Sequence, residues 1–130
     1  DETIADWMQG WINENHQSIA RYQNMHEKSE NTLNPPNQMR FPLVGKMYLD
    51  ENMLFVSRAA LNVALTHSMF TRQEVNNYMR SNKISEMRPT MSRLLAGDAG
   101  AGTTDLKCFK IHLAALTKLI GLMANKEEAA

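Results

Sequence analysis

The sequence predicts a mainly α fold with a small β component (α+β), in which a winged helix-turn-helix follows an N-terminal amphipathic helix. Two segments with helix-start signals stand next to each other at residues 57–68 and 71–82. A strand-like hairpin precedes this pair, and a glycine-rich loop between two short runs follows it. This order is typical of a winged helix-turn-helix, whose second helix enters a DNA groove.

The first expected element is an amphipathic helix near the N-terminus. Apolar side chains recur at the spacing of one helix face, and two indoles stand one turn apart. Because indoles are large, we expect them to anchor either the core or a docking site for a parent protein. The residues of this face are Ile4, Trp7, Met8, Trp11 and Ile12.

A polar segment divides this helix from the rest of the chain. Residues 27–40 read EKSENTLNPPNQMR and contain the pair Pro35-Pro36, which favours a loop. We therefore expect an N-terminal helical arm at 1–26, a mobile linker at 27–42, a winged-helix domain at 43–124 and a disordered tail at 125–130.

A hairpin and a first helix open the predicted domain. Residues 43–49 and 53–56 are rich in strand-forming residues and are separated by a polar turn. Ser57 is an N-cap candidate, and Val56 and Leu61 have the spacing of a hydrophobic staple.

The second helix of the pair has the clearest start signal in the chain. Thr71 and Glu74 form a capping-box pattern, and Val75, Tyr78 and Met79 are expected to point inward. Arginine can bind guanine in two places, and asparagine or glutamine can do the same with adenine, so the outer face is suited to reading bases. An ordinary solvated face is the alternative. The outward residues are Arg72, Gln73, Asn76, Asn77 and Arg80.

The last part of the chain predicts a wing and a closing helix. In residues 106–113 apolar residues alternate with Lys110 and His112, as in a half-buried strand. The preceding loop, 96–104, has Thr103 where a phosphate-binding P-loop needs lysine, so we interpret it as the tip of a wing. The closing helix is expected from residue 114 to about 124.

Charge is divided unevenly although the total is zero. Residues 57–113 carry eight basic and four acidic side chains, whereas residues 1–56 carry four basic and eight acidic ones. Attraction to phosphate therefore favours the second half of the chain. Expected contacts to the DNA backbone are Arg58, Lys83, Arg88, Arg93, Lys107 and Lys110.

No recognisable catalytic, metal or cofactor motif is present. The four histidines lack metal-ligand spacing, and the single Cys108 excludes an internal disulfide and indicates a structural thiol in a reducing, cytoplasmic setting. No apolar run approaches the roughly 20 residues of a membrane span. We expect no enzyme activity, cofactor, metal or membrane partner.

Three segments carry a resemblance to a known family: VGKMYLDENMLFVSRAAL (44–61), FTRQEVNNYMRSNKI (70–84) and RLLAGDAGAGTTDLKCFKIHLAAL (93–116). Their layout resembles the C-terminal winged-helix domain that follows the ATPase of phage, plasmid and mobile-element primase-helicases. The resemblance covers residues 1–120 and implies a DNA-binding module of a larger replication protein. An ATPase motif is missing, so any helicase activity would belong to other sequence, and the resemblance implies that Trp7 and Trp11 dock on a parent helicase or ATPase domain or on a partner protein.

The predicted function is therefore binding of duplex or forked DNA by the helix at 71–82 and the wing. The alternative is a protein-interaction or dimerisation domain without direct DNA binding. In that case the tryptophan helix and a surface formed by some of the ten methionines would engage the partner.

Overall fold

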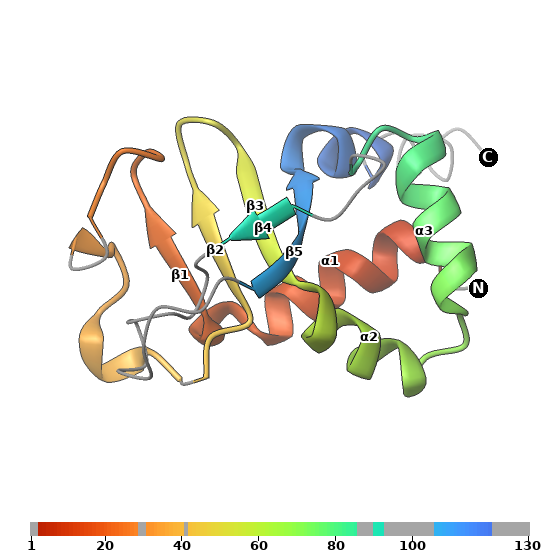
Figure 1. Cartoon of the computed structure of the whole chain (residues 1–130), viewed down its shortest axis with the longest axis horizontal. Helices are drawn as coiled ribbons and strands as arrows, with labels where there is room; N and C mark the ends of the chain where they lie inside the picture. The colour runs from red at the N-terminus through yellow and green to blue at the C-terminus, as the bar shows by residue number, and fades with distance from the viewer. Residues whose placement is uncertain (1–2, 29–30, 41, 86–89, 93–105, 121–130) are drawn as a thin grey trace.

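The computed structural model describes residues 3–28, 31–40, 42–85, 90–92 and 106–120. Its central layer is a five-stranded mixed sheet with the strand order β1-β2-β3-β5-β4 (Figure 1). Only the β1–β2 pair is parallel. The strands are β1 (Ile19–Tyr22), β2 (Gly45–Tyr48), β3 (Met53–Ser57), β4 (Thr90–Ser92) and β5 (Leu106–His112).

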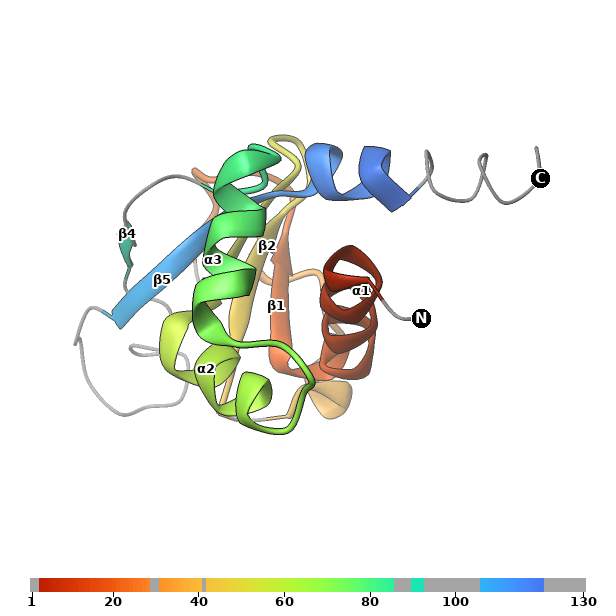
Figure 2. The ribbon, with the colours of Figure 1, turned by 90° about the vertical axis from the view of Figure 1, so that its right-hand side faces the viewer.

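The α-helices pack into a single core together with one face of the sheet. Leu54 and Val56 of β3 lie opposite Ile111 and Phe109 of β5, and all four belong to the cluster that the helices cover. In Figure 2 the molecule is turned so that α3, which lies at one end, faces the viewer. The helices are α1 (Ile4–Glu14), α2 (Arg58–Thr66), α3 (Arg72–Ser81) and a helix over residues 113–120, with short 3-10 turns η1 (His16–Ser18) and η3 (Pro36–Gln38).

The N-terminal residues are part of this core. Met8 and Ile12 of α1 are buried in the same cluster as the side chains of α2 and α3. Strand β1 then joins the sheet beside β2, with Ile19 opposite Gly45. Residues 1–26, which the sequence indicated as an attached arm, therefore contribute a helix and a strand to the domain within their described part.

The described residues between β1 and β2 lie against β1. The backbone N–H of Arg21 donates to the side-chain oxygen of Asn34 at 2.6 Å, and the Asn34 amide donates to the carbonyl of Ile19 at 2.9 Å. The backbone N–H of Arg40 donates to the Gln17 carbonyl at 2.8 Å. Because Asn34 is buried, this segment packs along the strand, although its mobility, expected for 27–42, stays a prediction.

The prediction of a mainly α fold with a small β component and a winged helix-turn-helix is wrong. The structure is α+β, and its sheet spans the domain as a central layer rather than forming a small accessory hairpin. The sequence leaves residues 19–22 open between a continued helix and a short extended segment, and the structure makes them strand β1, whose four residues pair with a strand more than twenty positions away. The glycine loop at 96–104 and the tail at 125–130 lie outside the described residues.

The individual elements near the pair of helices are confirmed. The expected strands at 43–49, 53–56 and 106–113 correspond to β2, β3 and β5. The expected helices at 57–68 and 71–82 correspond to α2 and α3, each shorter by one or two residues at its ends. The closing helix begins at residue 113 and is described to residue 120.

Candidate nucleic-acid interface

Helix α3 is fixed at its N-terminus by a complete capping box. The Thr71 hydroxyl accepts from the backbone N–H of Glu74 at 3.1 Å, and the Glu74 carboxylate accepts from the backbone N–H of Thr71 at 3.1 Å. Two of the donors that a helix start leaves unpaired are thereby satisfied. The sequence pattern predicted this arrangement, and the structure confirms it.

The turn between α2 and α3 is held by a serine where glycine is frequent. The Ser68 hydroxyl donates to the Leu65 carbonyl at 2.9 Å and accepts from the backbone N–H of Phe70 at 3.1 Å. Side-chain bonds of this kind hold a tight turn without a left-handed residue. Serine therefore fixes how α3 leaves α2.

The C-terminus of α3 is joined to the sheet. Lys83 has a positive φ of 56°, and the backbone N–H of Ile84 donates to the Met79 carbonyl at 2.8 Å. Ile84 is fully buried, and its carbonyl accepts from the backbone N–H of His112 at 2.7 Å. Because α3 is held at both ends, its outer face has a defined direction.

The outer face of α3 is polar and exposed. Val75 and Met79 are buried, as expected from the periodicity, and Tyr78 is half-buried. Burial and the charge of Asp6 on α1 raise the pKa of Tyr78, which indicates close packing of α1 and α3. Arg72, Gln73, Asn77 and Arg80 are exposed and Asn76 is half-buried, and none of the five side chains has a hydrogen bond or ion pair within the described part of the chain.

The other expected contact residues are dispersed. Lys83 is exposed at the end of α3, Arg58 is half-buried at the start of α2, and Lys107 is exposed at the start of β5. Lys110 lies opposite Phe55, on the sheet face away from the helices, because Phe109 and Ile111 point into the helix-covered core. It therefore does not share a surface with α3. Arg88 and Arg93 lie outside the described residues.

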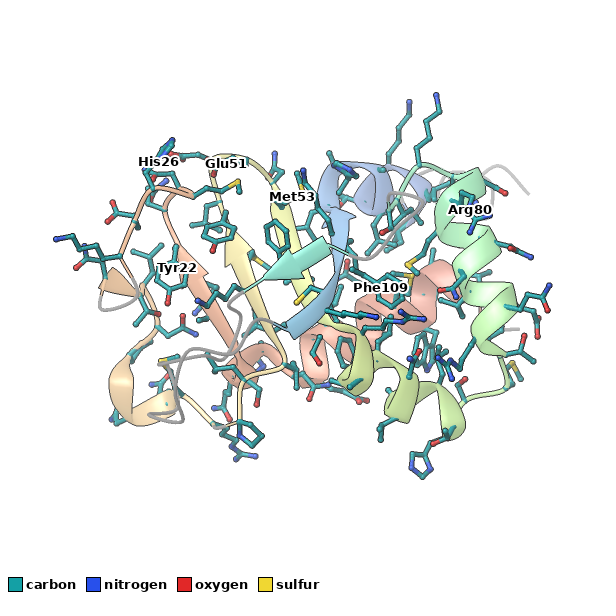
Figure 3. All side chains as sticks on the ribbon, viewed as in Figure 1. Tyr22, His26, Glu51, Met53, Arg80 and Phe109 are labelled. Atoms are coloured by element: carbon teal, nitrogen blue, oxygen red, sulfur yellow. The ribbon has the colours of Figure 1, made fainter. Side chains whose placement is uncertain are left out.

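The sheet face away from the helices carries an aromatic cluster that the sequence did not predict. Tyr22 stacks on Tyr48 with ring centroids 5.7 Å apart, and Tyr48 meets Phe55 edge-on at 5.8 Å. The Lys46 ammonium lies 5.8 Å from the centroid of the Tyr22 ring, and Tyr22 is labelled in Figure 3. With Tyr22 2% exposed and Phe55 7% exposed, this cluster is a second core rather than an open platform for bases. Only the parallel register of β1 brings the two tyrosines together.

The single thiol is structural, as expected. Cys108 is the one cysteine of the sequence, so it forms no disulfide within the chain, and it is fully buried beside Phe55. Burial raises the pKa of the Cys108 thiol to about 11, and the nearby Lys46 charge opposes this only in part. A thiol with such a pKa is protonated at neutral pH and is a poor nucleophile.

In the described ranges, no cluster of three or more histidine, cysteine or acidic side chains could hold a metal ion. None of the helices within those ranges is long and apolar enough to cross a membrane. Comparisons with models of protein families, with curated proteins and with solved structures found no match. The function proposed below therefore rests on the residues of this chain.

Proposed function

We propose that this chain is a non-enzymatic DNA-binding module that presents the outer face of α3 to duplex or forked DNA. The observation that carries this proposal is the row of unpaired arginine and amide side chains on a helix that is held at both ends. Unpaired side chains lose no internal contacts when they bind bases. A fixed helix loses little conformational entropy on binding.

The two kinds of side chain on α3 have different roles in the proposal. Gln73, Asn76 and Asn77 read base edges, and the amides are suited to adenine. Arg72 and Arg80, two turns apart, contact either guanine or the phosphates on both sides of the groove. Lys83, exposed just beyond the helix, adds a further phosphate contact. Arg58 and Lys107 are secondary phosphate contacts.

The context proposed for the module is a replication or mobile-element protein. The layout of the segments at 44–61, 70–84 and 93–116 resembles the C-terminal domain of primase-helicases and supports this context. A reducing, cytoplasmic location fits the single, buried thiol. The chain requires no cofactor for this role.

Fluorescence anisotropy with labelled duplex and forked DNA of mixed sequence, at several salt concentrations, tests the proposal. The double variant Arg72→Gln/Arg80→Gln should weaken binding by at least roughly tenfold at low salt, since two phosphate or guanine contacts are lost. The matched control is Lys28→Gln/Arg40→Gln, which removes the same charge from two exposed residues between β1 and β2. Equal loss in both variants, or no binding by the unmodified protein at low salt, contradicts the proposal.

The alternative function is protein–protein interaction or dimerisation without direct DNA contact. Two apolar side chains support it, because Val63 on α2 is 62% exposed and Met69, just before α3, is 74% exposed. Exposed apolar side chains that gather in one patch mark partner surfaces. Sedimentation analysis of the protein alone shows whether a second copy is the partner.

A further inference from the structure

A groove runs between α1 and α2, on a different surface from the outer face of α3. Its volume is about 310 Å³, at the small end of the range for ligand sites. Such a groove has room for a side chain of a partner rather than for a large cofactor. It is lined by Trp7, Gly10, Trp11 and Glu14 of α1, by Ala64 of α2 and by His67, the C-cap of α2.

The groove exists because α1 has a second, less covered stripe beside the stripe that faces the core. Ala5, Met8 and Ile12 face the core and are buried. The residues at 7, 10, 11 and 14 follow the i, i+3, i+4, i+7 spacing of the neighbouring stripe, in which the first three are half-buried and Glu14 is exposed. A Cβ atom placed on Gly10 would meet nothing within 4 Å, so the missing side chain leaves the middle of the groove open.

The electrostatic character of the groove is negative. Among the described lining residues Glu14 is the one acidic side chain, and none of them is a lysine or arginine. It stands in the last turn of α1, which contains no basic residue. Because the C-terminal end of a helix carries partial negative charge, the dipole and the carboxylate attract a cation to the same place.

The aromatic walls of the groove suit a flat cation. Trp7 is held by Phe70, whose ring meets it edge-on with centroids 6.4 Å apart. Neither indole N–H nor the Glu14 carboxylate has a hydrogen-bond partner within the described residues. Guanidinium groups stack flat on indoles and form two parallel hydrogen bonds with a carboxylate, whereas an ammonium lacks the planar group that both contacts need.

We propose that this groove binds an arginine side chain of a partner protein, with the guanidinium against the indoles of Trp7 and Trp11 and paired with Glu14. Charge complementarity favours this occupant, because the groove combines a carboxylate, the negative end of a helix and two aromatic rings. The inference is independent of DNA binding, since α3 contributes none of the lining residues.

The chain provides its own probe for the test. Its two tryptophans both line the groove, so all tryptophan fluorescence reports on this site. The intact protein is titrated at pH 8 with the acetylated tripeptide amide glycine-arginine-glycine. The matched ligand replaces arginine with citrulline, which has the same shape without the charge. A saturable change in tryptophan fluorescence with the arginine peptide supports the proposal, provided that the affinity for the citrulline peptide is lower by at least roughly fivefold.

Two variants test the charge of Glu14 and the open space at Gly10 separately. Glu14→Gln should weaken the arginine peptide about fivefold, whereas Glu27→Gln, an exposed acid in the turn after β1, should leave its affinity unchanged. Gly10→Leu should abolish binding, because the new side chain fills the open groove while the helix is retained. Two-dimensional NMR should show both indole N–H signals shifting together. Equal binding of the two peptides, or no saturable change, overturns the proposal.

Discussion

The side-chain amide of Asn34 donates to the carbonyl of Ile19 at 2.9 Å, and its oxygen accepts from the backbone N–H of Arg21 at 2.6 Å. One side chain thus continues the hydrogen-bonding pattern at the outer edge of β1. A segment with two adjacent prolines cannot supply a regular strand there, so an asparagine side chain takes the place of a backbone.

Asn34→Ala should lower the free energy of unfolding by about 1–3 kcal/mol, because it removes the partners of the buried Ile19 carbonyl and of the part-buried Arg21 N–H. Urea denaturation monitored by circular dichroism measures the change. Asn37→Ala, at an exposed position in η3, is the control and should be near neutral. Similar effects of the two variants would show that the Asn34 bonds do not stabilise the fold.

Substitution by alanine should have opposite effects on stability at Gly45 and at Gly10. At Gly45 a Cβ would lie 2.8 Å from the Phe55 carbonyl oxygen, so Gly45→Ala should destabilise the protein by about 1–3 kcal/mol. At Gly10, where a Cβ has open space inside α1, Gly10→Ala should stabilise it by about 0.5–1 kcal/mol. Thermal melts of both variants check this, and a loss of stability at Gly10 would contradict the helix assignment.

Substitutions in α3 should change the sequence specificity of DNA binding, whereas substitutions in β5 should change only the general affinity for DNA. If α3 reads bases, Arg72→Ala or Asn76→Ala should cost about 1–3 kcal/mol on a preferred site and reduce the preference. Lys107→Ala should weaken binding to all DNA sequences alike. The slope of log K against log salt concentration should become shallower by about one unit. Arg93→Ala is expected to behave as Lys107→Ala does. Anisotropy on selected and scrambled duplexes distinguishes the outcomes; a uniform loss for Asn76→Ala would speak against base reading.

Alkaline pH should destabilise the protein through Cys108. An unfolded thiol ionises near pH 9, whereas burial raises the folded pKa to about 11, so the folded state holds its proton more tightly. This contribution is complete below pH 9 and is lost as pH rises toward 11. Urea midpoints measured from pH 8 to 11 should fall, and Cys108→Ala should fall less. Tyr78→Phe is the companion variant, because its raised pKa acts in the same direction.

Local signals in the sequence predicted α2, α3 and their capping, because caps and staples depend on residues within one turn of each other. The polar face of α3 followed from the same periodicity. The fold class did not follow, because it depends on the pairing of β1 with β2, to which no local pattern in residues 19–22 points. The groove at Trp7 and Trp11 could not be predicted either. The spacing places both indoles on one helix face, but the groove also needs the second wall that α2 provides, and the sequence does not show that α1 and α2 pack together.

The parallel pairing of β1 and β2 also has a consequence for the order of folding. Antiparallel neighbours such as β2 and β3 are joined by a tight turn, so their contacts close small loops. Residues 23–44 connect β1 to β2, and closing this longer segment loses more chain entropy before any bond forms. We therefore expect the hairpin with α2 and α3 to assemble first. The N-terminal helix and β1 are synthesised earlier on the ribosome, but they are then the last elements to pack onto the rest of the domain.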